Sequence, residues 1–304
     1  MARFVQMLQK SGVYSDQNFM IVPQHGFNLV ALRDGKDYRI DYDNRLDVQE
    51  VRFNQVDRIA NEYVQKRAGG QESIDQLTRL RTSMYGTIAP AARAKLLQVS
   101  AKGAGIPVIK AKHGSIEVRL DVGILRRKEF SVAFKLVKHM NSQGAMVPLT
   151  KFQTGDVQRW IDQLNWIFGA QTNIYFKLVG AEWVPIRRTL GQPMNADVFK
   201  KTLVPYKHGS ANLTCFLVGK YKGDETGTHA AGTYFGPEKV CVVDDGPHQG
   251  IFDDWTYDSF VGVMAHEFAH FLGGPHHSRG PLLLSRGIET CELDKQLVAQ
   301  LNPW

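Results

Sequence analysis

The sequence predicts an α+β protein, and two kinds of periodicity lead to this fold class. Apolar residues alternate with polar ones along 130–136, as in a strand that is buried on one face. Along 157–168 apolar residues recur at three- and four-residue steps, as in an amphipathic helix. Segments of both kinds alternate from residue 126 onwards. We therefore expect a C-terminal domain of alternating strands and helices, 126–304, preceded by an α/β N-terminal region, 1–125.

The C-terminal domain is expected to begin with the strand 130–136 and a helix that Thr154 caps before residue 157. Runs rich in β-formers and bounded by turn residues predict the later strands. A long helix then follows, and a short helix closes the chain. The expected strands are 173–179, 213–218, 231–235 and 240–243, and the expected helices are 254–272 and 292–301.

The N-terminal region has a different pattern. Short strands are expected within 18–43, with turns at 23–26 and 34–37, and another strand at 115–122. Apolar spacing predicts three helices between them, at 48–63, 74–84 and 91–101. The region contains no cysteine, so it has no thiolate with which to cap a metal. It could serve as a pro-segment, as a substrate or partner module, or as a packed extension of the C-terminal domain.

Composition narrows the class of protein. The 304 residues carry a net charge of +7, and residues 1–125 hold 18 basic against 13 acidic residues. The basic residues are dispersed among acids rather than clustered with aromatics, so no nucleic-acid partner is expected. No apolar run is long enough to span a membrane. Residues 1–20 lack the apolar stretch of a signal peptide, which leaves a cytoplasmic location or signal-independent export open. Nothing indicates the oligomeric state.

The cysteines do not form a disulfide framework. There are three, an odd number at low density. Cys215 and Cys241 lie in apolar, strand-like runs, which favours buried free thiols. A single bridge between them stays open at this point.

The sequence around His266 carries the functional signal, because it reads H-E-x-x-H-x-x-G-x-x-H. On a helix, His266 and His270 are one turn apart and face the same way, so both can bind one metal ion. Glu267 lies beside them, and Gly273 permits a turn that brings His276 round as a third ligand. The spacing selects His276 rather than the adjacent His277. Three protein ligands leave one position open, which is typical of one catalytic zinc ion.

This segment resembles the signature of the metzincin zinc peptidases. The resemblance implies that His266, His270 and His276 bind zinc and that Glu267 is the general base. It implies a zinc endopeptidase with a metzincin-like catalytic domain over 126–304. Such a domain has a mixed twisted sheet with an edge strand, an active-site helix and a small C-terminal subdomain. This sequence departs from the family's pattern at the methionine turn, since no methionine follows Met264 and Leu284 stands at the expected position.

Metzincins bind a protein or peptide substrate antiparallel to an edge strand, for which the matching segment is 230–235. The resemblance therefore implies substrate binding by Gly232, Thr233 and Tyr234, although an ordinary hairpin is an alternative. Tyr234 and Tyr257 are conceivable oxyanion helpers, but packing residues are the simpler interpretation. Two other functions stay open. One is an inactive zinc-binding interaction module, and the other is a zinc hydrolase that acts on a non-peptide amide.

Overall fold

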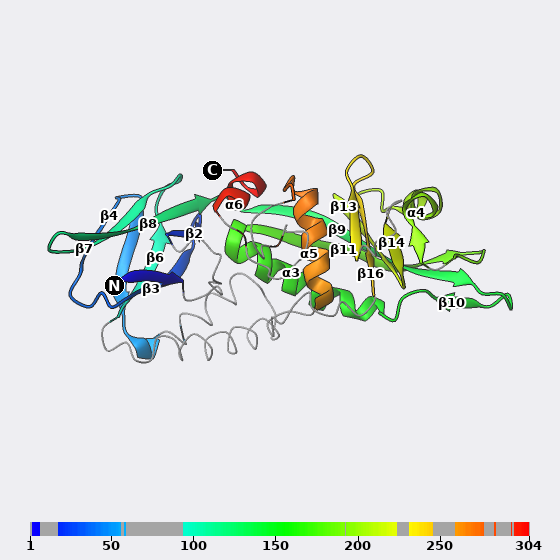
Figure 1. Cartoon of the computed structure of the whole chain (residues 1–304), viewed down its shortest axis with the longest axis horizontal. Helices are drawn as coiled ribbons and strands as arrows, with labels where there is room; N and C mark the ends of the chain where they lie inside the picture. The colour runs from blue at the N-terminus through cyan, green and yellow to red at the C-terminus, as the bar shows by residue number, and fades with distance from the viewer. Residues whose placement is uncertain are drawn as a thin grey trace. The chain divides into compact units, whose positions relative to one another are not determined.

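The computed structural model describes residues 2–6, 18–55, 58, 94–191, 193–223, 231–245, 259–276, 283, 293 and 295–303 (Figure 1). Its contacts divide the chain into two units. Unit 1 comprises residues 1–128, 165–175 and 292–304, and unit 2 comprises residues 129–164 and 176–291. No helix among the described residues has the length and apolar character needed to cross a membrane. The functional division at residue 125 stays a prediction.

Unit 1 is built on two four-stranded sheets. The first has the order β1-β3-β6-β5 and is antiparallel throughout. The second has the order β2-β8-β7-β4, in which only β2 and β8 are parallel. Buried residues of both sheets, such as Val99 and Leu120, belong to one hydrophobic cluster. The strands are β1 (Arg3–Gln6), β2 (Phe19–Pro23), β3 (Phe27–Arg33), β4 (Arg39–Tyr42), β5 (Leu46–Val51), β6 (Lys95–Ala101), β7 (Val108–His113) and β8 (Ile116–Leu125).

The strands predicted within 18–43 and at 115–122 are confirmed, but the helix predicted at 91–101 is wrong over its described residues. The helix predicted at 48–63 is wrong at 48–51, whereas most of its second half lies outside the described residues. Val48 and Val51 lie in β5, and residues 95–101 form β6, because these two segments pair with each other. Val48 lies opposite Val99 on β6, and both belong to or pack against the cluster of unit 1. Cross-strand packing of β-branched residues therefore overrides the three-residue spacing that suggested a helix. The helix predicted at 74–84 lies outside the described residues.

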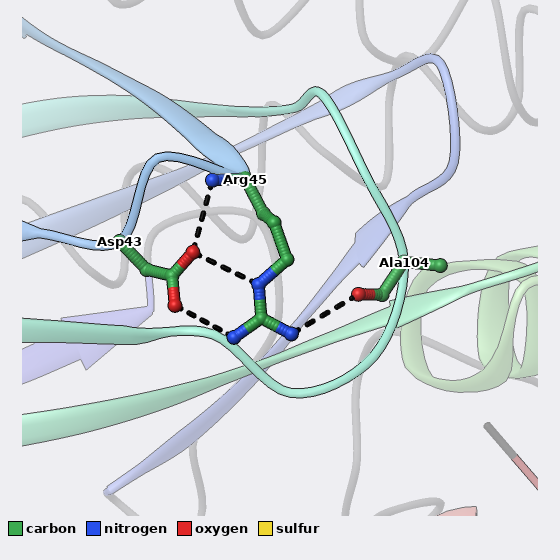
Figure 2. Close-up of polar contacts among 3 residues, drawn as sticks. All are labelled: Asp43, Arg45 and Ala104. Carbon is green, nitrogen blue, oxygen red and sulfur yellow. Dashed lines mark hydrogen bonds and ion pairs between the residues drawn. The ribbon is translucent and has the colours of Figure 1, made fainter.

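An ion pair fixes the turn between β4 and β5. The Asp43 carboxylate accepts hydrogen bonds from Nε and Nη2 of Arg45 at 2.8 and 2.6 Å and from the Arg45 backbone N–H at 3.0 Å (Figure 2). Nη1 of Arg45 donates to the carbonyl oxygen of Ala104 at 3.4 Å. The guanidinium group thus joins this turn to the connection that follows β6. It also lowers the pKa of the Asp43 carboxyl to about 2.

This ion pair makes the titration of Asp43 predictable. We expect the carboxyl carbon signal of Asp43 to stay flat in an NMR titration from pH 7 to pH 3. An ordinary aspartate passes its midpoint at about pH 3.9 in that range. Because the folded-state pKa is lowered, the pair stabilises unit 1 above the ordinary pKa, and this contribution is lost as the pH falls through about 2. In Arg45→Met the signal should move within the titrated range. An unchanged flat signal in that variant would contradict the assignment.

Unit 2 is built on a mixed six-stranded sheet. Its order is β10-β9-β13-β16-β15, and β11 also pairs with β9. Strand β13 is parallel to both β9 and β16, whereas β15 is antiparallel to β16 and ends the sheet. The strands are β9 (Lys128–Met140), β10 (Met146–Pro148), β11 (Ile174–Ile186), β13 (Leu213–Val218), β15 (Gly232–Phe235) and β16 (Val240–Asp244). Among the described residues β15 pairs with β16 only, so it is an edge strand as predicted.

The two faces of this sheet carry different partners. One face is covered by α5 (Ser259–Phe271) and by the first part of α3 (Val157–Thr172) (Figure 1). The rings of Phe268 on α5 and Trp160 on α3 both contact Phe134 of β9. On the other face a second hydrophobic cluster joins Phe216 to Phe199 of α4 (Ala196–Thr202). The remaining elements there are β12 (Met194–Asn195), η3 (Val204–Tyr206) and β14 (Tyr221–Gly223), with β12 and β14 forming a two-stranded sheet.

The helices of the C-terminal half lie close to their predicted positions. A 3-10 turn, η2 (Thr154–Asp156), precedes α3, and the Asp156 carboxylate accepts the backbone N–H of Gln153 at 2.8 Å. The predicted cap is therefore wrong by one residue, since Gln153 and not Thr154 is the N-cap. The closing helix is α6 (Lys295–Leu301), which belongs to unit 1. Residues 254–258 of the predicted motif helix lie outside the described residues.

Candidate metal centre

Helix α5 presents two histidines of the motif on one side. His266 and His270 are four residues apart, and their ring centroids are 4.7 Å apart. Nearly every residue of the helix is buried, which fits its apolar sequence. Phe268 is fully buried and contacts Phe134 of β9 and Phe176 of β11. The packing of α5 thus determines which way the two imidazoles face.

The end of α5 turns the chain back towards the histidines. Gly273 has a φ of +94°, a left-handed conformation that a side chain would strain. The N–H of Gly273 donates to the carbonyl oxygen of His270 at 3.0 Å, and the N–H of Gly274 donates to that of Ala269 at 2.9 Å. This pair of bonds is the Schellman motif, which ends a helix and reverses the chain. His276 follows two residues later and reaches the other two rings.

The three imidazoles converge through their Nε2 atoms. The Nε2 atom of His266 lies 3.0 Å from that of His270 and 3.3 Å from that of His276. The remaining distance, between His270 and His276, is 3.2 Å. A tetrahedral zinc ion with Zn–N distances of about 2.0–2.1 Å needs nitrogen ligands about 3.3–3.4 Å apart. The triangle of nitrogens, with sides of 3.0–3.3 Å, is slightly smaller than a bound zinc ion requires.

Hydrogen bonds to backbone carbonyls fix the tautomers of two rings. Nδ1 of His266 lies 2.6 Å from the carbonyl oxygen of Leu283, and Nδ1 of His270 lies 2.8 Å from that of Gly274. A carbonyl oxygen only accepts, so each Nδ1 carries a proton and each neutral ring has a lone pair on Nε2. Burial and the neighbouring His270 ring lower the pKa of His266 to about 4, and burial also lowers the pKa of His270. The lone pairs of these neutral rings converge and repel one another unless a cation lies between them. The three rings are therefore suited to bind a cation.

Glu267 lies next to this cluster and is almost completely buried. Its relative exposure is 6%, and burial raises the pKa of its carboxyl to about 8, although the backbone N–H of Tyr234 donates a hydrogen bond to it. A buried carboxylate without a compensating charge is costly. A cation on the three histidines would supply such a charge and favour the ionised form. The structure therefore places a buried carboxyl group next to three histidines that could hold a metal ion.

Two buried cysteines lie on neighbouring strands, and one of them is near Glu267. Cys215 on β13 and Cys241 on β16 are paired in register, and both are buried and free. The prediction of free thiols is therefore confirmed. The thiol of Cys241 contacts Cys215 and lies near Glu267, and its pKa is raised, mainly by burial. The Cys241 thiol is therefore one of the buried groups near the Glu267 carboxyl.

The structure brings together the predicted site residues that it describes. The exposure of the histidines rises from buried His266 through half-buried His270 to exposed His276. Gly232, Thr233 and Tyr234 lie on the edge strand β15, which contacts α5. The Tyr234 ring packs edge-on against Phe271, with centroids 6.1 Å apart. Tyr257, Leu284 and His277 lie outside the described residues.

Sequence reasoning missed the carbonyl groups that orient the rings. Leu283 is fully buried and contacts His266 through its backbone oxygen, and Gly274 acts on His270 in the same way. A backbone carbonyl is present at every residue, so no side-chain pattern could have marked these two positions. The close approach of Gly232 to Glu267 also leaves no local signature, because the two residues are far apart in the sequence.

The sequence matches no protein-family model, and no curated protein matches it. Among solved structures it is similar to an archaemetzincin from Methanopyrus kandleri, at 12% identity over 57% of this chain and 93% of that chain, with a TM-score of 0.39. It is also similar to a zinc-dependent peptidase from Methanocorpusculum labreanum, at 13% identity over 57% of this chain and 100% of that chain, with a TM-score of 0.36. Domains 1–6 of the surface layer protein SbsC give 11% identity, coverages of 48% and 17%, and a TM-score of 0.22.

Likeness at this level carries no argument about activity.

Proposed function

We propose that the chain is a zinc-dependent endopeptidase of metzincin type. The observation that carries this proposal is the triangle of Nε2 atoms 3.0–3.3 Å apart on His266, His270 and His276, beside the buried Glu267 carboxyl. Three protein ligands, one of them exposed, leave a position on the metal open for water or substrate. A bound zinc ion supplies a Lewis acid that lowers the pKa of water from about 15.7 towards 7.

Glu267 moves the protons of the reaction in this proposal. Its carboxylate takes a proton from the attacking water and then gives that proton to the amine that leaves the cleaved peptide bond. The Tyr234 backbone N–H holds the carboxylate in place. The carbonyl oxygens of Leu283 and Gly274 keep the Nδ1 protons of His266 and His270 in place, so that their Nε2 atoms remain free to bind metal.

The edge strand is proposed to hold the substrate backbone. The N–H of Asp244 donates to the carbonyl oxygen of Ala231 at 2.9 Å, so Ala231 faces β16. Backbone groups alternate in direction along an antiparallel strand, so those of Gly232 and Tyr234 face away from β16 and those of Thr233 face towards it. The Tyr234 N–H is held by Glu267, and the Thr233 hydroxyl donates to the Gly232 carbonyl oxygen at 2.7 Å. Among the described contacts of the strand, the outward Tyr234 carbonyl group is left to accept an N–H donor of an extended peptide.

Metal removal combined with cleavage profiling tests this function. We expect the zinc-loaded protein to cut peptides of a proteome-derived library at internal bonds. Removal of the metal by 1,10-phenanthroline should abolish cleavage, and one equivalent of zinc should restore it. A protein that binds one zinc ion yet cuts no peptide would contradict the proposal. Such a result would instead favour an inactive zinc-binding interaction module or a zinc hydrolase that acts on a non-peptide amide.

A further inference from the structure

The first residue of the edge strand lies against the proposed general base. Gly232 and Tyr234 are two residues apart on β15, so they face the same side of the sheet, and the Tyr234 ring packs on Phe271 of α5. A Cβ atom at position 232 would lie 3.0 Å from both Cγ and Oε1 of Glu267. It would also lie 3.0 Å from the carbonyl oxygen of Val242. The Glu267 side chain therefore fills the space that a side chain at position 232 would need.

These distances are shorter than nearly all contacts of a Cβ atom, so a neighbour would have to yield by a few tenths of an ångström. The favourable separation between carbons is about 3.5–4.0 Å. The Val242 oxygen belongs to the central backbone of the sheet, where β16 pairs on both sides, so it does not yield easily. The yielding atoms would be those of Glu267. Glu267 is 6% exposed, its carboxylate receives the Tyr234 N–H and it lies near Cys241, so a shift of its side chain would disturb these contacts.

We infer that Gly232 is a positioning residue, whose missing side chain sets where the Glu267 carboxylate lies relative to the three histidines. The inference rests on the proposed function, in which Glu267 transfers protons. It differs from a role for Gly232 in binding substrate through its backbone, because alanine keeps the backbone groups and changes only the space. Gly232→Ala should therefore lower kcat, whereas loss of a substrate contact would raise KM.

Gly236 offers a matched control just after the same strand. A Cβ atom at position 236 would meet only the Tyr234 ring, at an ordinary 3.7 Å. We expect Gly232→Ala to lower kcat about tenfold, because Glu267 must yield by a few tenths of an ångström and a displacement of about 1 Å in a catalytic group costs about 100-fold. KM and the zinc content of one per chain should stay near those of the parent, and Gly236→Ala should match the parent throughout. An unchanged kcat in Gly232→Ala would overturn the inference.

A thermal unfolding cycle gives a readout that needs no activity. Gly232→Ala should lower the Tm of the metal-free full chain by a few degrees. In a Glu267→Ala background the same substitution should lower the Tm less, because the contact with the Glu267 side chain is then gone and only the contact with the Val242 carbonyl oxygen remains. An equal loss of Tm in both backgrounds would overturn the inference. A parent protein without peptidase activity would overturn the proposed function only, and the Tm cycle would still decide whether Gly232 makes room for Glu267.

Discussion

Glu267→Gln is expected to reduce peptide hydrolysis by about 10²–10⁴-fold, the usual contribution of general acid–base catalysis. The amide keeps the shape of the side chain but accepts no proton from water. The substitution should leave the zinc content near one per chain, since the ligand atoms belong to His266, His270 and His276. Turnover of a fluorogenic peptide, measured together with metal analysis of the same sample, checks both parts.

Controls separate loss of the base from loss of the fold. Burial disfavours the charged form of Glu267, so a neutral amide at this position should not lower the Tm of the metal-free protein. Glu267→Ala should be as inactive as Glu267→Gln, although it also empties the space beside Gly232. Retained hydrolysis in either variant, with zinc bound, would mean that another group accepts the proton.

The sequence was most informative where chemistry requires a fixed local spacing. His266 and His270 converge because a helix places residues four apart on one side, and Gly273 adopts the positive φ that the turn after the helix requires. The strands of unit 2 could be predicted because buried central strands are apolar and end at turn residues. Residues 213–218, for example, form a strand with every residue buried. Local rules were sufficient in these places.

The predictions failed where long-range pairing decides the local structure. The segments 48–51 and 95–101 were expected to be helical, yet each forms a strand because the other supplies its hydrogen bonds. No window of sequence around Val48 contains that partner, which lies about fifty residues later. The same reason hides the contact between Gly232 and Glu267, which depends on how β15 packs on α5. Spatial neighbours that are distant in sequence leave no periodic signal.

His276→Ala is expected to weaken zinc binding by at least about 100-fold. Structural zinc sites with four ligands bind with apparent free energies of about 10–16 kcal/mol, which is roughly 3 kcal/mol for each ligand. Each 1.4 kcal/mol changes the binding constant about tenfold. The Nε2 atom of His276 lies 3.3 and 3.2 Å from those of His266 and His270, so its loss removes one corner of the triangle.

His277→Ala is the matched control for this prediction, because it removes a histidine from the neighbouring position and leaves the spacing of the motif intact. Competition with a chromophoric chelator measures zinc affinity without any peptidase assay. We expect the affinity of His277→Ala to match the parent, whereas weakening in His277→Ala alone would make that residue the third ligand. His276 is exposed, so its replacement should not disturb the packing of α5. A fall in zinc affinity without a fall in the Tm of the metal-free protein would then report the lost ligand itself.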